Sequence, residues 1–274
     1  MQSEFNKIHE KSSDWLRLLA RSEIRINILR ILKERSMKLS GLRDDMNLTS
    51  STILHAMKDM EDEGLIVNTE EGYTLTNIGR VQAILIADLI KAISVLTKNK
   101  DFWLSHDISG IPDYLLKRLG DLNGCEVVKS TTTDLFKPHS NFVGILSNSK
   151  EVKGVSPIFY REYPEIIERL VKKNVNVNTV VTNEVLSFLR TGGYKPRFED
   201  LLKKENFRLW VMEEEIKVAF TVTDSFFSFG LFRKDGTYDV TTDLTSQRSG
   251  AIKWGNDLYE YYCKKSNRYT FKDF

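Results

Sequence analysis

The sequence predicts an α+β protein of two domains, a helical N-terminal domain followed by a mixed α/β domain. A chain of 274 residues is longer than one typical domain of roughly 100–200 residues. Apolar residues recur at helical spacing through the first part, where no proline occurs before Pro112. After Asp113, β-prone runs alternate with helical patterns and then follow one another directly. This order is typical of a sheet with parallel and antiparallel pairing.

The composition is that of an ordinary globular protein and excludes several classes. Hydrophobic residues make up 41% of the chain and charged residues 28%. No apolar run approaches the ~18 residues of a membrane span, and the N-terminus lacks the apolar core of a signal peptide. We therefore expect a cytoplasmic protein with no membrane partner. Cys125 and Cys263 lack metal-ligand spacing, so we expect no metal and no cofactor, and buried thiols rather than redox-active ones.

Residues 39–73 predict two helices joined by a turn. Apolar residues at helical spacing place a short helix over 39–46, and Asn47 begins the turn. Thr49 or Ser50 is suited to cap the second helix, because its side-chain oxygen accepts a backbone N–H. The buried face of that second helix comprises four apolar residues: Ile53, Ala56, Met57 and Met60.

The same stretch continues into a β-hairpin. Gly64 ends the second helix, Leu65 to Val67 predict a strand, and Glu70 to Gly72 predict the turn before a returning strand. Two helices followed by a hairpin form a winged helix-turn-helix, whose second helix enters the DNA major groove. The alternative is a helical hairpin inside a larger core.

The run SSTILHAMKDMEDEGLI resembles the recognition helix of winged-helix regulators, which begins with small hydroxyl residues and ends in a pattern similar to Met60–Leu65 here. The resemblance implies a double-stranded DNA operator as partner. The residues that we expect to contact base edges or phosphates on this helix are Ser50, Ser51, Thr52 and His55, with Lys58 on phosphate and Leu54 near a thymine methyl. Further candidates for phosphate contacts are Lys38, Arg43 and Arg80.

The charge balance argues against indiscriminate binding to nucleic acids. The formal net charge is +2, and the first 100 residues hold 15 Lys and Arg against 14 Asp and Glu. Because DNA affinity depends on neutralised phosphates, binding must come from local clustering, from dimerisation or from both. The predicted wing tip carries Glu70 and Glu71, and these acidic residues slightly favour a winged helix that binds protein instead of DNA.

Two further helical patterns flank the helix pair. Residues 14–35 open the domain: the apolar stripe from Ile24 to Leu32 predicts its first helix. Trp15 to Leu19 predict a preceding helix, suited to a dimer interface or to simple packing. Thr76 and Asn77 are suited to cap a helix from about Ile78 to Lys98, whose apolar residues cover more than one face. Homodimerisation explains the second apolar face, and docking onto the second domain is the alternative.

These patterns divide the chain into three segments. Residues 1–77 form the winged helix-turn-helix domain, 78–111 the dimerisation helix and its join, and 112–274 the α/β effector domain. The join contains the apolar residues Phe102 to Leu104 before Gly110 and Pro112. We expect this apolar cluster to pack against the second domain and to make the connection stiff.

The second domain begins with a short helix in YLLKRLGDL and continues through strands and helices. The predicted strands are Cys125–Lys129, Lys153–Pro157, Val175–Thr182, Phe207–Met212, Ile216–Val222 and Phe226–Phe232. The predicted helices are Tyr163–Lys173, Val185–Arg190 after a cap at Asn183, and Ser249–Lys264. The run Lys234-Asp235-Gly236 predicts a hairpin turn.

Three stretches of this domain resemble a known family. FFSFGLFRKDGTYDVTTDL, AIKWGNDLYEYY and FWLSHDISGIPDYLLKRLGDL are similar to the archaeal methanogenesis and filamentation regulators, and the resemblance covers nearly the whole chain. It implies an archaeal transcription regulator with an N-terminal winged helix, a C-terminal sensor-like domain and no defined ligand. The sensor half also resembles the phospholipase D-like α/β domain of archaeal sugar-sensing regulators.

We expect no enzyme, and the phospholipase D-like domain is expected to lack the catalytic motif. That motif has a histidine followed two residues later by a lysine. His9 has Lys11 at this offset but lies in the N-terminal tail, and the other histidines, His55, His106 and His139, lack it. The sequence also lacks a Gly-rich phosphate loop and the H-E-x-x-H, G-x-S-x-G and Cys-x-x-Cys patterns.

Two small clusters are candidates for binding a small-molecule effector. Asp107 is suited to orient the ring of His106, and the alternative, which we favour, is that both residues cap the following helix or hold the linker. Arg161, between Tyr160 and Tyr163, is suited to hold an anionic effector by paired hydrogen bonds, and its alternative is a surface arginine beside aromatic rings.

Taken together, the sequence predicts a dimeric DNA-binding transcriptional regulator whose α/β domain senses an effector and sets the spacing of two recognition helices. A second interpretation is a small-molecule hydrolase or binding protein whose winged helix serves protein interaction. In a third, the α/β domain takes no ligand and only stabilises the dimer.

Overall fold

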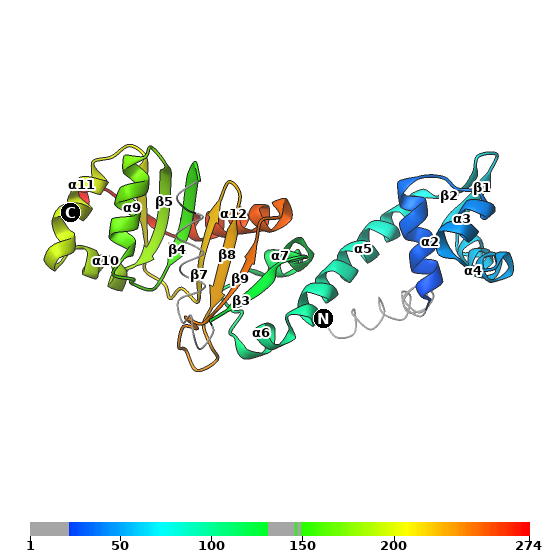
Figure 1. The fold of residues 1–274 in the computed structure, drawn as a ribbon, viewed down its shortest axis with the longest axis horizontal. Coiled ribbons are helices and arrows are strands. Elements are labelled where there is room, and N and C mark those ends of the chain that lie inside the picture. Colours follow the sequence, from blue (N-terminus) through cyan, green and yellow to red (C-terminus); the bar gives the residue numbers. More distant parts are fainter. Residues whose placement is uncertain (1–21, 131–145, 147–148) are drawn as a thin grey trace, which may run out of the picture. The chain divides into compact units, whose positions relative to one another are not determined.

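The computed structural model describes residues 22–130, 146 and 149–274 (Figure 1). The chain divides into two compact units, Met1–Ile90 and Lys91–Phe274. The division falls inside α5 (Asn77–Lys98) and therefore inside the predicted segment 78–111. The predicted apolar segment from Trp15 to Leu19 lies outside the described residues. No helix in the described ranges is both long enough and apolar enough to cross a membrane.

The N-terminal unit has the predicted order of helices followed by a hairpin, which is confirmed. Its elements are α2 (Glu23–Glu34), α3 (Leu39–Met46), α4 (Ser50–Asp62), β1 (Ile66–Thr69) and β2 (Gly72–Leu75), with β1 and β2 antiparallel. Asn47 ends α3 with a φ of 51°, a left-handed conformation that asparagine tolerates. The Thr49 side chain then accepts the backbone N–H of Thr52 and caps α4.

The core of this unit lies between α2, α3, α4 and the hairpin. The four residues predicted for the inner face of α4 are buried: Ile53, Ala56, Met57 and Met60. They pack with Ile28, Leu29 and Leu42 from the other two helices. The guanidinium of Arg25 on α2 forms an ion pair with Asp59 on α4. Among residues 22–90, the opposite face of α4 is exposed, as helical spacing requires.

Thr76 connects the hairpin to α5, as predicted from its position. Its side-chain oxygen accepts the backbone N–H of Gly79 at 3.1 Å, and its own N–H donates to the carbonyl of Leu65 at 3.0 Å. A Cβ atom on Gly79 would lie 1.9 Å from that Leu65 carbonyl oxygen. Glycine is therefore required where the first turn of α5 contacts the start of the wing.

Within the described residues of the C-terminal unit, eight strands form one sheet of order β10-β6-β5-β4-β7-β8-β9-β3. The strands are β3 (Glu126–Lys129), β4 (Glu151–Ser156), β5 (Asn176–Thr182), β6 (Phe207–Met212), β7 (Val218–Thr223), β8 (Phe227–Leu231), β9 (Thr242–Ser246) and β10 (Asn267–Tyr269). The neighbours β4, β5 and β6 are parallel and the remaining pairs are antiparallel. The predicted mixed sheet is confirmed.

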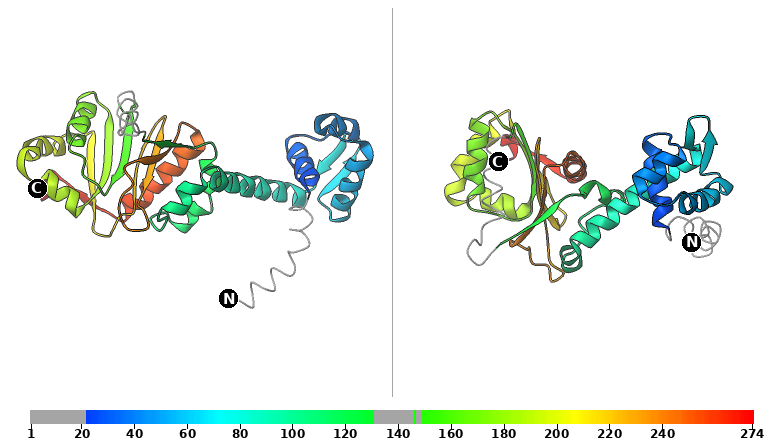
Figure 2. Two further views of the ribbon diagram at one scale, coloured as in Figure 1. Left: turned by 60° about the horizontal axis from the view of Figure 1, so that its bottom comes forward. Right: turned by 45° about the vertical axis from the view of Figure 1, so that its right-hand side comes forward.

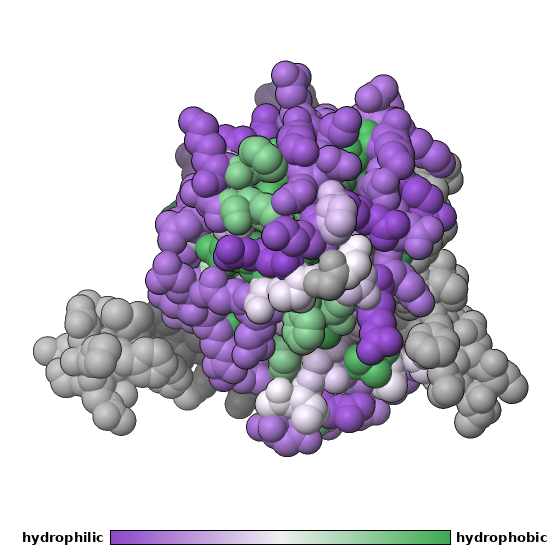
Figure 3. Space-filling view, turned by 90° about the vertical axis from the view of Figure 1, so that its left-hand side faces the viewer, coloured by the Kyte–Doolittle hydropathy of each residue, from purple (hydrophilic) through white to green (hydrophobic). Residues whose placement is uncertain are grey.

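Helices cover both faces of this sheet (Figure 2). On one face, α12 (Ser249–Lys264) buries Trp254 among the phenylalanines of β7 and β8. The opposite face packs against α9 (Tyr163–Lys172), α10 (Asn183–Leu189) and α11 (Lys195–Leu202). The end of the unit that carries α10 and α11 is mainly hydrophilic, with small apolar patches (Figure 3).

The join between α5 and the sheet packs into the C-terminal unit, as predicted. It consists of α6 (Lys100–Ser105) and α7 (Asp113–Leu116). Phe102 is buried beside Val95 of α5, and the indole N–H of Trp103 donates to the Val95 carbonyl at 3.2 Å. The C-terminal part of α5 is therefore part of the core of this unit.

Some local predictions for the C-terminal unit were wrong or incomplete. The residue that caps α10 is Thr182, whose hydroxyl accepts the N–H of Val185, and not Asn183. The chain also forms α11, β9 and β10, for which the sequence pattern gave no prediction. The predicted turn at Lys234–Gly236 is present within a longer connection between β8 and β9, where Arg233 donates its N–H to the Thr237 carbonyl.

Candidate nucleic-acid interface and ligand cavity

The outer face of α4 brings together most of the predicted DNA-contacting residues. Ser51, Thr52, Leu54, His55 and Lys58 are exposed, and Ser50 is half-buried. The first backbone N–H groups of a helix have no intrahelical acceptor, so the N-terminus of α4 also offers donors suited to a phosphate. This face combines hydroxyl groups, an imidazole, an ammonium group and one exposed leucine.

The three basic residues predicted outside α4 are all exposed, but they come from other elements. Lys38 precedes α3, Arg43 lies on α3 and Arg80 lies on α5. Arg43 forms an ion pair with Asp44 at 2.8 Å, which reduces its positive field. The wing tip carries exposed Glu70 and Glu71. The interface of one chain is therefore only weakly basic, in agreement with the near-neutral composition.

The helix α5 exposes a long apolar stripe. Its exposed large apolar residues are Ile78, Val81, Ile84, Leu85, Leu89, Ile90, Ile93 and Leu96, each between 42% and 64% exposed. Six of them follow steps of three and four residues and therefore share one side of the helix. Ala83 packs into the N-terminal core and Val95 into the C-terminal core. The stripe itself lies outside both of these cores.

A cavity opens in the C-terminal unit between α9 and the sheet. It holds about 920 Å³ of space, counting its open mouth. Tyr163, Ile166, Ile167 and Leu170, which share one side of α9, form one wall. Its floor is a row of small residues that are neighbours across four strands. The register of the sheet places Thr179 of β5, Gly154 of β4, Thr221 of β7 and Ser228 of β8 in this row.

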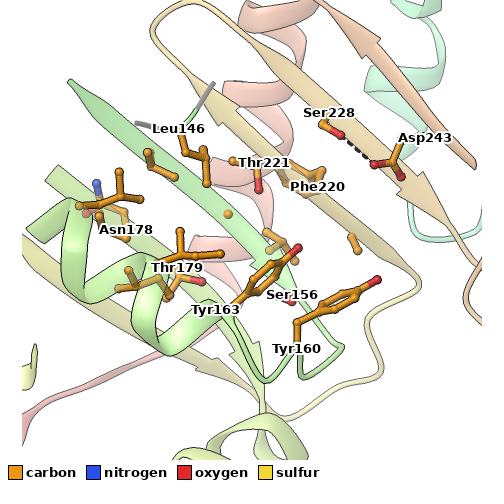
Figure 4. Close-up of a pocket in the computed structure, with 18 of the residues that line it drawn as sticks. Leu146, Ser156, Tyr160, Tyr163, Asn178, Thr179, Phe220, Thr221, Ser228 and Asp243 are labelled. Atoms are coloured by element: carbon orange, nitrogen blue, oxygen red, sulfur yellow. Dashed lines mark hydrogen bonds between the residues drawn. The ribbon is translucent and has the colours of Figure 1, made fainter. Parts of the chain in front are cut away.

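Gly154 lies at the centre of this floor. A Cβ atom there would lie 3.6 Å from the Thr221 hydroxyl and 3.8 Å from the Thr179 hydroxyl, so both hydroxyls approach the space above the glycine. Figure 4 shows Thr179, Thr221 and Tyr163 around this space, and the hydrogen bond from Ser228 to Asp243. That bond measures 3.1 Å. The floor is thus polar although most of the surrounding wall is apolar.

Three tyrosines and one carboxylate form the end of the cavity near β8 and β9. Burial raises the pKa of Tyr160 to about 12, with Asp243 adding to the effect. Burial likewise raises the pKa of Tyr163 and of Tyr238 well above the ordinary value. These phenols therefore remain protonated at neutral pH and act as hydrogen-bond donors. The rings of Tyr160 and Tyr163 are 4.8 Å apart between centroids.

A second, smaller hollow adjoins the cavity, with about 530 Å³ of space when its opening to solvent is counted. The two share Ser156, Tyr160, Tyr163, Ile167 and Thr179. The remaining described residues around the second hollow are all apolar: Ile158, Phe159, Pro164, Val181, Val185, Leu189, Phe198, Leu201, Phe207 and Leu209. Together the two hollows form a site with a polar floor at one end and an apolar extension at the other.

The structure separates the residues that were predicted to bind an effector. Tyr160 and Tyr163 line the cavity, whereas Arg161 between them is exposed and is not among its described lining residues. His106 and Asp107 directly follow α6 in the join, where their partners are residues of the β8–β9 connection and of the segment before β7. The two predicted clusters do not form one site.

His106 is buried and contacts acceptors through both ring nitrogens. Nδ1 lies 2.7 Å from the Phe102 carbonyl oxygen, and Nε2 lies 3.2 Å from a carboxylate oxygen of Asp239. Asp107 accepts the backbone N–H of Ser109 at 2.8 Å and pairs with Lys217 at 3.1 Å. The hydrogen bond from Ser109 and the charge of Lys217 hold the pKa of Asp107 at about 2. These contacts hold the join against the sheet.

Sequence reasoning missed the floor of the cavity. The sequence pattern that indicates this floor is the alternation in FSFGL of β8. Phe227, Phe229 and Leu231 face the α12 core, while Ser228 and Gly230 face the other side of the sheet. Gly154 is a second indication, because it is a residue without a side chain inside the β-prone run EVKGVS. Glycine and hydroxyl residues on one face of central strands indicate a face that is not filled by a core.

Two sequence profiles match this chain. The N-terminal domain of the methanogenesis regulatory protein FilR1 matches residues 13–94, and the middle domain of the same protein matches residues 135–265. The FilR1 protein of Methanothrix harundinacea (strain 6Ac) is 34% identical over 254 residues, which is 92% of this chain. The chain spans 57% of the length of that relative.

Both profiles come from one regulatory protein, and they match the helical N-terminal unit and most of the sheet-based second unit. The chain belongs to the family of the methanogenesis regulatory protein FilR1, which confirms the resemblance seen in the sequence.

Three solved structures overlap only partially with this chain. TrmBL2, described as an archaeal chromatin protein with a novel mode of DNA binding, has a TM-score of 0.44 and 13% identity, covering 85% of this chain and 88% of its own. Phosphatidylserine synthase of Haemophilus influenzae Rd KW20 has a TM-score of 0.39 and 8% identity, covering 55% and 41%. An IclR transcriptional regulator of Alicyclobacillus acidocaldarius has a TM-score of 0.25 and 10% identity, covering 88% and 95%. No inference about this chain follows from these overlaps.

Proposed function

We propose that the protein is a DNA-binding transcriptional regulator that reads its operator with α4. One observation carries the proposal: the face of α4 opposite its buried stripe exposes Ser51, Thr52, His55 and Lys58 together. Hydroxyl and imidazole groups hydrogen-bond to base edges in the major groove, and an ammonium group pairs with phosphate. Membership of a regulatory family supports this function.

The proposal includes a homodimer formed through α5. One chain offers a weakly basic interface, so tight binding to DNA needs a second recognition helix. The stripe from Ile78 to Leu96 is apolar along a helix of 22 residues, and exposed apolar area of this length is suited to a two-fold contact with the same helix of a second copy. An α5 pair would then set the distance between two copies of α4.

Other parts of the sequence prediction also remain predictions. They include the limits of the domains, a phospholipase D-like fold for the C-terminal unit and a cytoplasmic location. The alternative function, a hydrolase whose winged helix binds protein, gains no support from the cavity, whose described lining contains Ser228 and Asp243 but no histidine.

Selection of bound fragments from the genomic DNA of the source organism tests the DNA-binding function. The purified full chain is expected to enrich fragments that share one sequence, with two half-sites if the protein binds as a dimer. Enrichment no better than that of a protein without DNA affinity would contradict the proposal. Repeating the selection at two salt concentrations separates sequence-specific binding from phosphate contacts.

A further inference from the structure

The floor of the cavity has hydrogen-bonding capacity that the protein does not use. Within the described part of the chain, the hydroxyls of Thr179 and Thr221 make no side-chain hydrogen bond, and both residues are half-buried. They flank Gly154, whose missing side chain leaves the space between them open. Neither hydroxyl is sealed from solvent, so water or a ligand in the cavity can supply the partner.

We propose that this cavity binds an uncharged small molecule, with its polar end over Gly154 and its apolar body beside Tyr163, and that binding is transmitted to α5 through Tyr238, Asp239 and His106. The binding step stands independently of the proposed DNA-binding function. Only the consequence for operator binding rests on it.

The shape and lining of the two hollows define the ligand class. The polar end needs one or two oxygen atoms that hydrogen-bond with the hydroxyls of Thr179 and Thr221. The apolar body fits the adjoining hollow, whose wall is formed by residues such as Val181, Leu189 and Leu209. A site of this combination takes a compact molecule that is polar at one end only.

The described lining offers no positive charge to an anion. None of the described residues around either hollow is a lysine, arginine or histidine, so a ligand carboxylate or phosphate would lose its hydration without gaining a cationic partner. Asp243 on β9 lies at the end of the cavity, where one of its oxygens accepts the Ser228 hydroxyl. The exposed Arg161 lies outside the described lining, so the anionic effector suggested by the sequence does not suit this cavity.

The connection between β8 and β9 contacts both the cavity and the segment that follows α6. Tyr238 lines the cavity, and its hydroxyl group lies so close to Gly230 that a Cβ atom there would be 2.2 Å away. The next residue, Asp239, is buried and contacts Nε2 of His106 at 3.2 Å. In the same connection the Phe232 carbonyl accepts the backbone N–H of Asp107 at 2.8 Å.

The other side of His106 leads directly to α5. Its Nδ1 faces the carbonyl of Phe102, and Phe102 packs beside Val95 of α5 in one core. A ligand that moves or orders Tyr238 therefore acts on a continuous chain of packed and hydrogen-bonded groups that ends on α5. Because α5 carries the proposed dimer contact, this route would alter how two recognition helices are held.

A matched set of small probes tests the binding step. Hexane-1,2-diol is uncharged, hexanoate is an anion with the same number of heavy atoms, and hexylamine is a cation of similar length. NMR titration of the methyl signals of Ile166, Ile167 and Val240 should show saturable binding of the diol at millimolar concentration and at least tenfold weaker binding of hexanoate. Equal binding of hexanoate, preferred binding of hexylamine, or no binding of the diol would overturn the assignment.

Two variants locate the ligand within the cavity. Thr179→Val combined with Thr221→Val removes both hydroxyls at nearly constant volume and should weaken diol binding about tenfold. Gly154→Val should abolish it by filling the floor, whereas Gly154→Ala, whose Cβ makes only ordinary contacts, should keep the fold and weaken it less. Unchanged binding to the double valine variant would contradict the position of the polar end, and an unchanged far-UV circular dichroism spectrum checks that each variant is folded.

Hydrogen exchange without DNA tests the transmission step. In the wild-type chain the diol should slow amide exchange by at least twofold both in residues 232–241 and in residues 95–107. In Asp239→Asn the diol should still bind and protect 232–241, but the effect on 95–107 should be abolished. His106→Gln serves as a second variant with the same expected result. Protection of 232–241 alone in the wild type would refute the route, and no outcome here depends on whether the protein binds DNA.

Discussion

The ring of His106 contacts the carboxylate of Asp239 across 133 positions of the sequence, at 3.2 Å between Nε2 and Oδ2. Burial raises the pKa of Asp239, but hydrogen bonds from Thr241 and the charge of Arg233 outweigh it and leave that pKa below its ordinary value. Asp239 is therefore a carboxylate at neutral pH. It holds the residue at the end of α6 against the connection between β8 and β9, and so links the join to the sheet.

The ion pair of Asp107 with Lys217 predicts a dependence of stability on pH. The folded-state pKa of Asp107 is lowered from 3.8 to about 2, so the carboxylate contributes stability above pH 3.8 that is lost as the pH falls toward 2. We expect Asp107→Ala to lower the free energy of unfolding at neutral pH, and the difference from wild type to shrink across that window. Urea unfolding at several pH values measures it.

Lys217→Met provides the matched comparison for this pair. It removes the ammonium group but leaves the hydrogen bond from Ser109, which is the larger cause of the lowered pKa. Its effect at neutral pH should therefore be smaller than that of Asp107→Ala. A difference between wild type and Asp107→Ala that stays constant from pH 5 to pH 2 would show that the carboxylate is not stabilised in the folded state.

If the apolar stripe of α5 forms the dimer contact, two charged residues placed on it should dissociate the dimer. Leu85→Glu combined with Leu89→Glu places carboxylates at two positions that are 64% and 54% exposed in one chain. These changes should leave the monomer folded and shift the mass from dimer to monomer, because burying unpaired charges in an interface is costly. Sedimentation equilibrium or light scattering measures the mass.

Ser94→Glu is the control for the α5 stripe. Ser94 is exposed on the opposite side of the same helix, so a carboxylate there should leave the dimer intact. Dissociation by this control as well would indicate a general charge effect. A wild-type chain that is monomeric at all accessible concentrations would remove α5 as the dimer contact.

The contact of Gly79 with the start of the wing predicts a sharp requirement for glycine. Gly79→Ala forces its Cβ atom against the Leu65 carbonyl, and we expect a decrease of roughly 1–3 kcal/mol in unfolding free energy. A Cβ atom on Gly193 meets nothing within 4 Å, so Gly193→Ala should change stability by less than about 0.5 kcal/mol. Urea unfolding of both variants compares them, and equal stabilities would contradict the close packing of α5 on the wing.

Lys58 on α4 and Lys33 on α2 are a matched pair for phosphate contact. Both are exposed lysines on helices of the N-terminal unit, but only Lys58 lies on the proposed interface. Lys58→Ala should weaken binding to all DNA sequences alike and reduce the slope of log affinity against log salt by about 1 per chain. Lys33→Ala should leave both quantities unchanged, as measured by fluorescence anisotropy over a salt series.

Elements that depend on local signals were predictable from the sequence. The helix pair, the cap at Thr49, the buried face of α4 and the limits of α12 follow from periodicity and capping residues within one stretch. The strand β9, with the sequence TDLTS, was missed because Leu244 is its one apolar residue, so it shows no alternation of apolar and polar residues. It forms because β8 and β3 supply partners on both sides, and no local window contains that information.

The two candidate sites also differ in how far the sequence alone could predict them. The outer face of α4 is one helix face, so its exposed residues could be assigned from spacing alone. The cavity is made by residues from α9, β4, β5, β7, β8 and β9, and only Tyr160 and Tyr163 were singled out in advance. His106 and Asp107 are neighbours in sequence, but their side chains have separate partners, and only the fold reveals those partners.

The central claim is that α4 reads the operator. The affinity of a triple alanine variant of α4 for the selected operator tests this claim most directly. Ser51→Ala, Thr52→Ala and His55→Ala combined should cost roughly 1–3 kcal/mol for each base-reading side chain that is truncated, which weakens binding to the operator at least tenfold. Binding to unrelated DNA should change little, and the control Lys33→Ala with Glu34→Ala on α2 should bind as the wild type does. Wild-type affinity and selectivity in the triple variant would show that α4 does not read the operator.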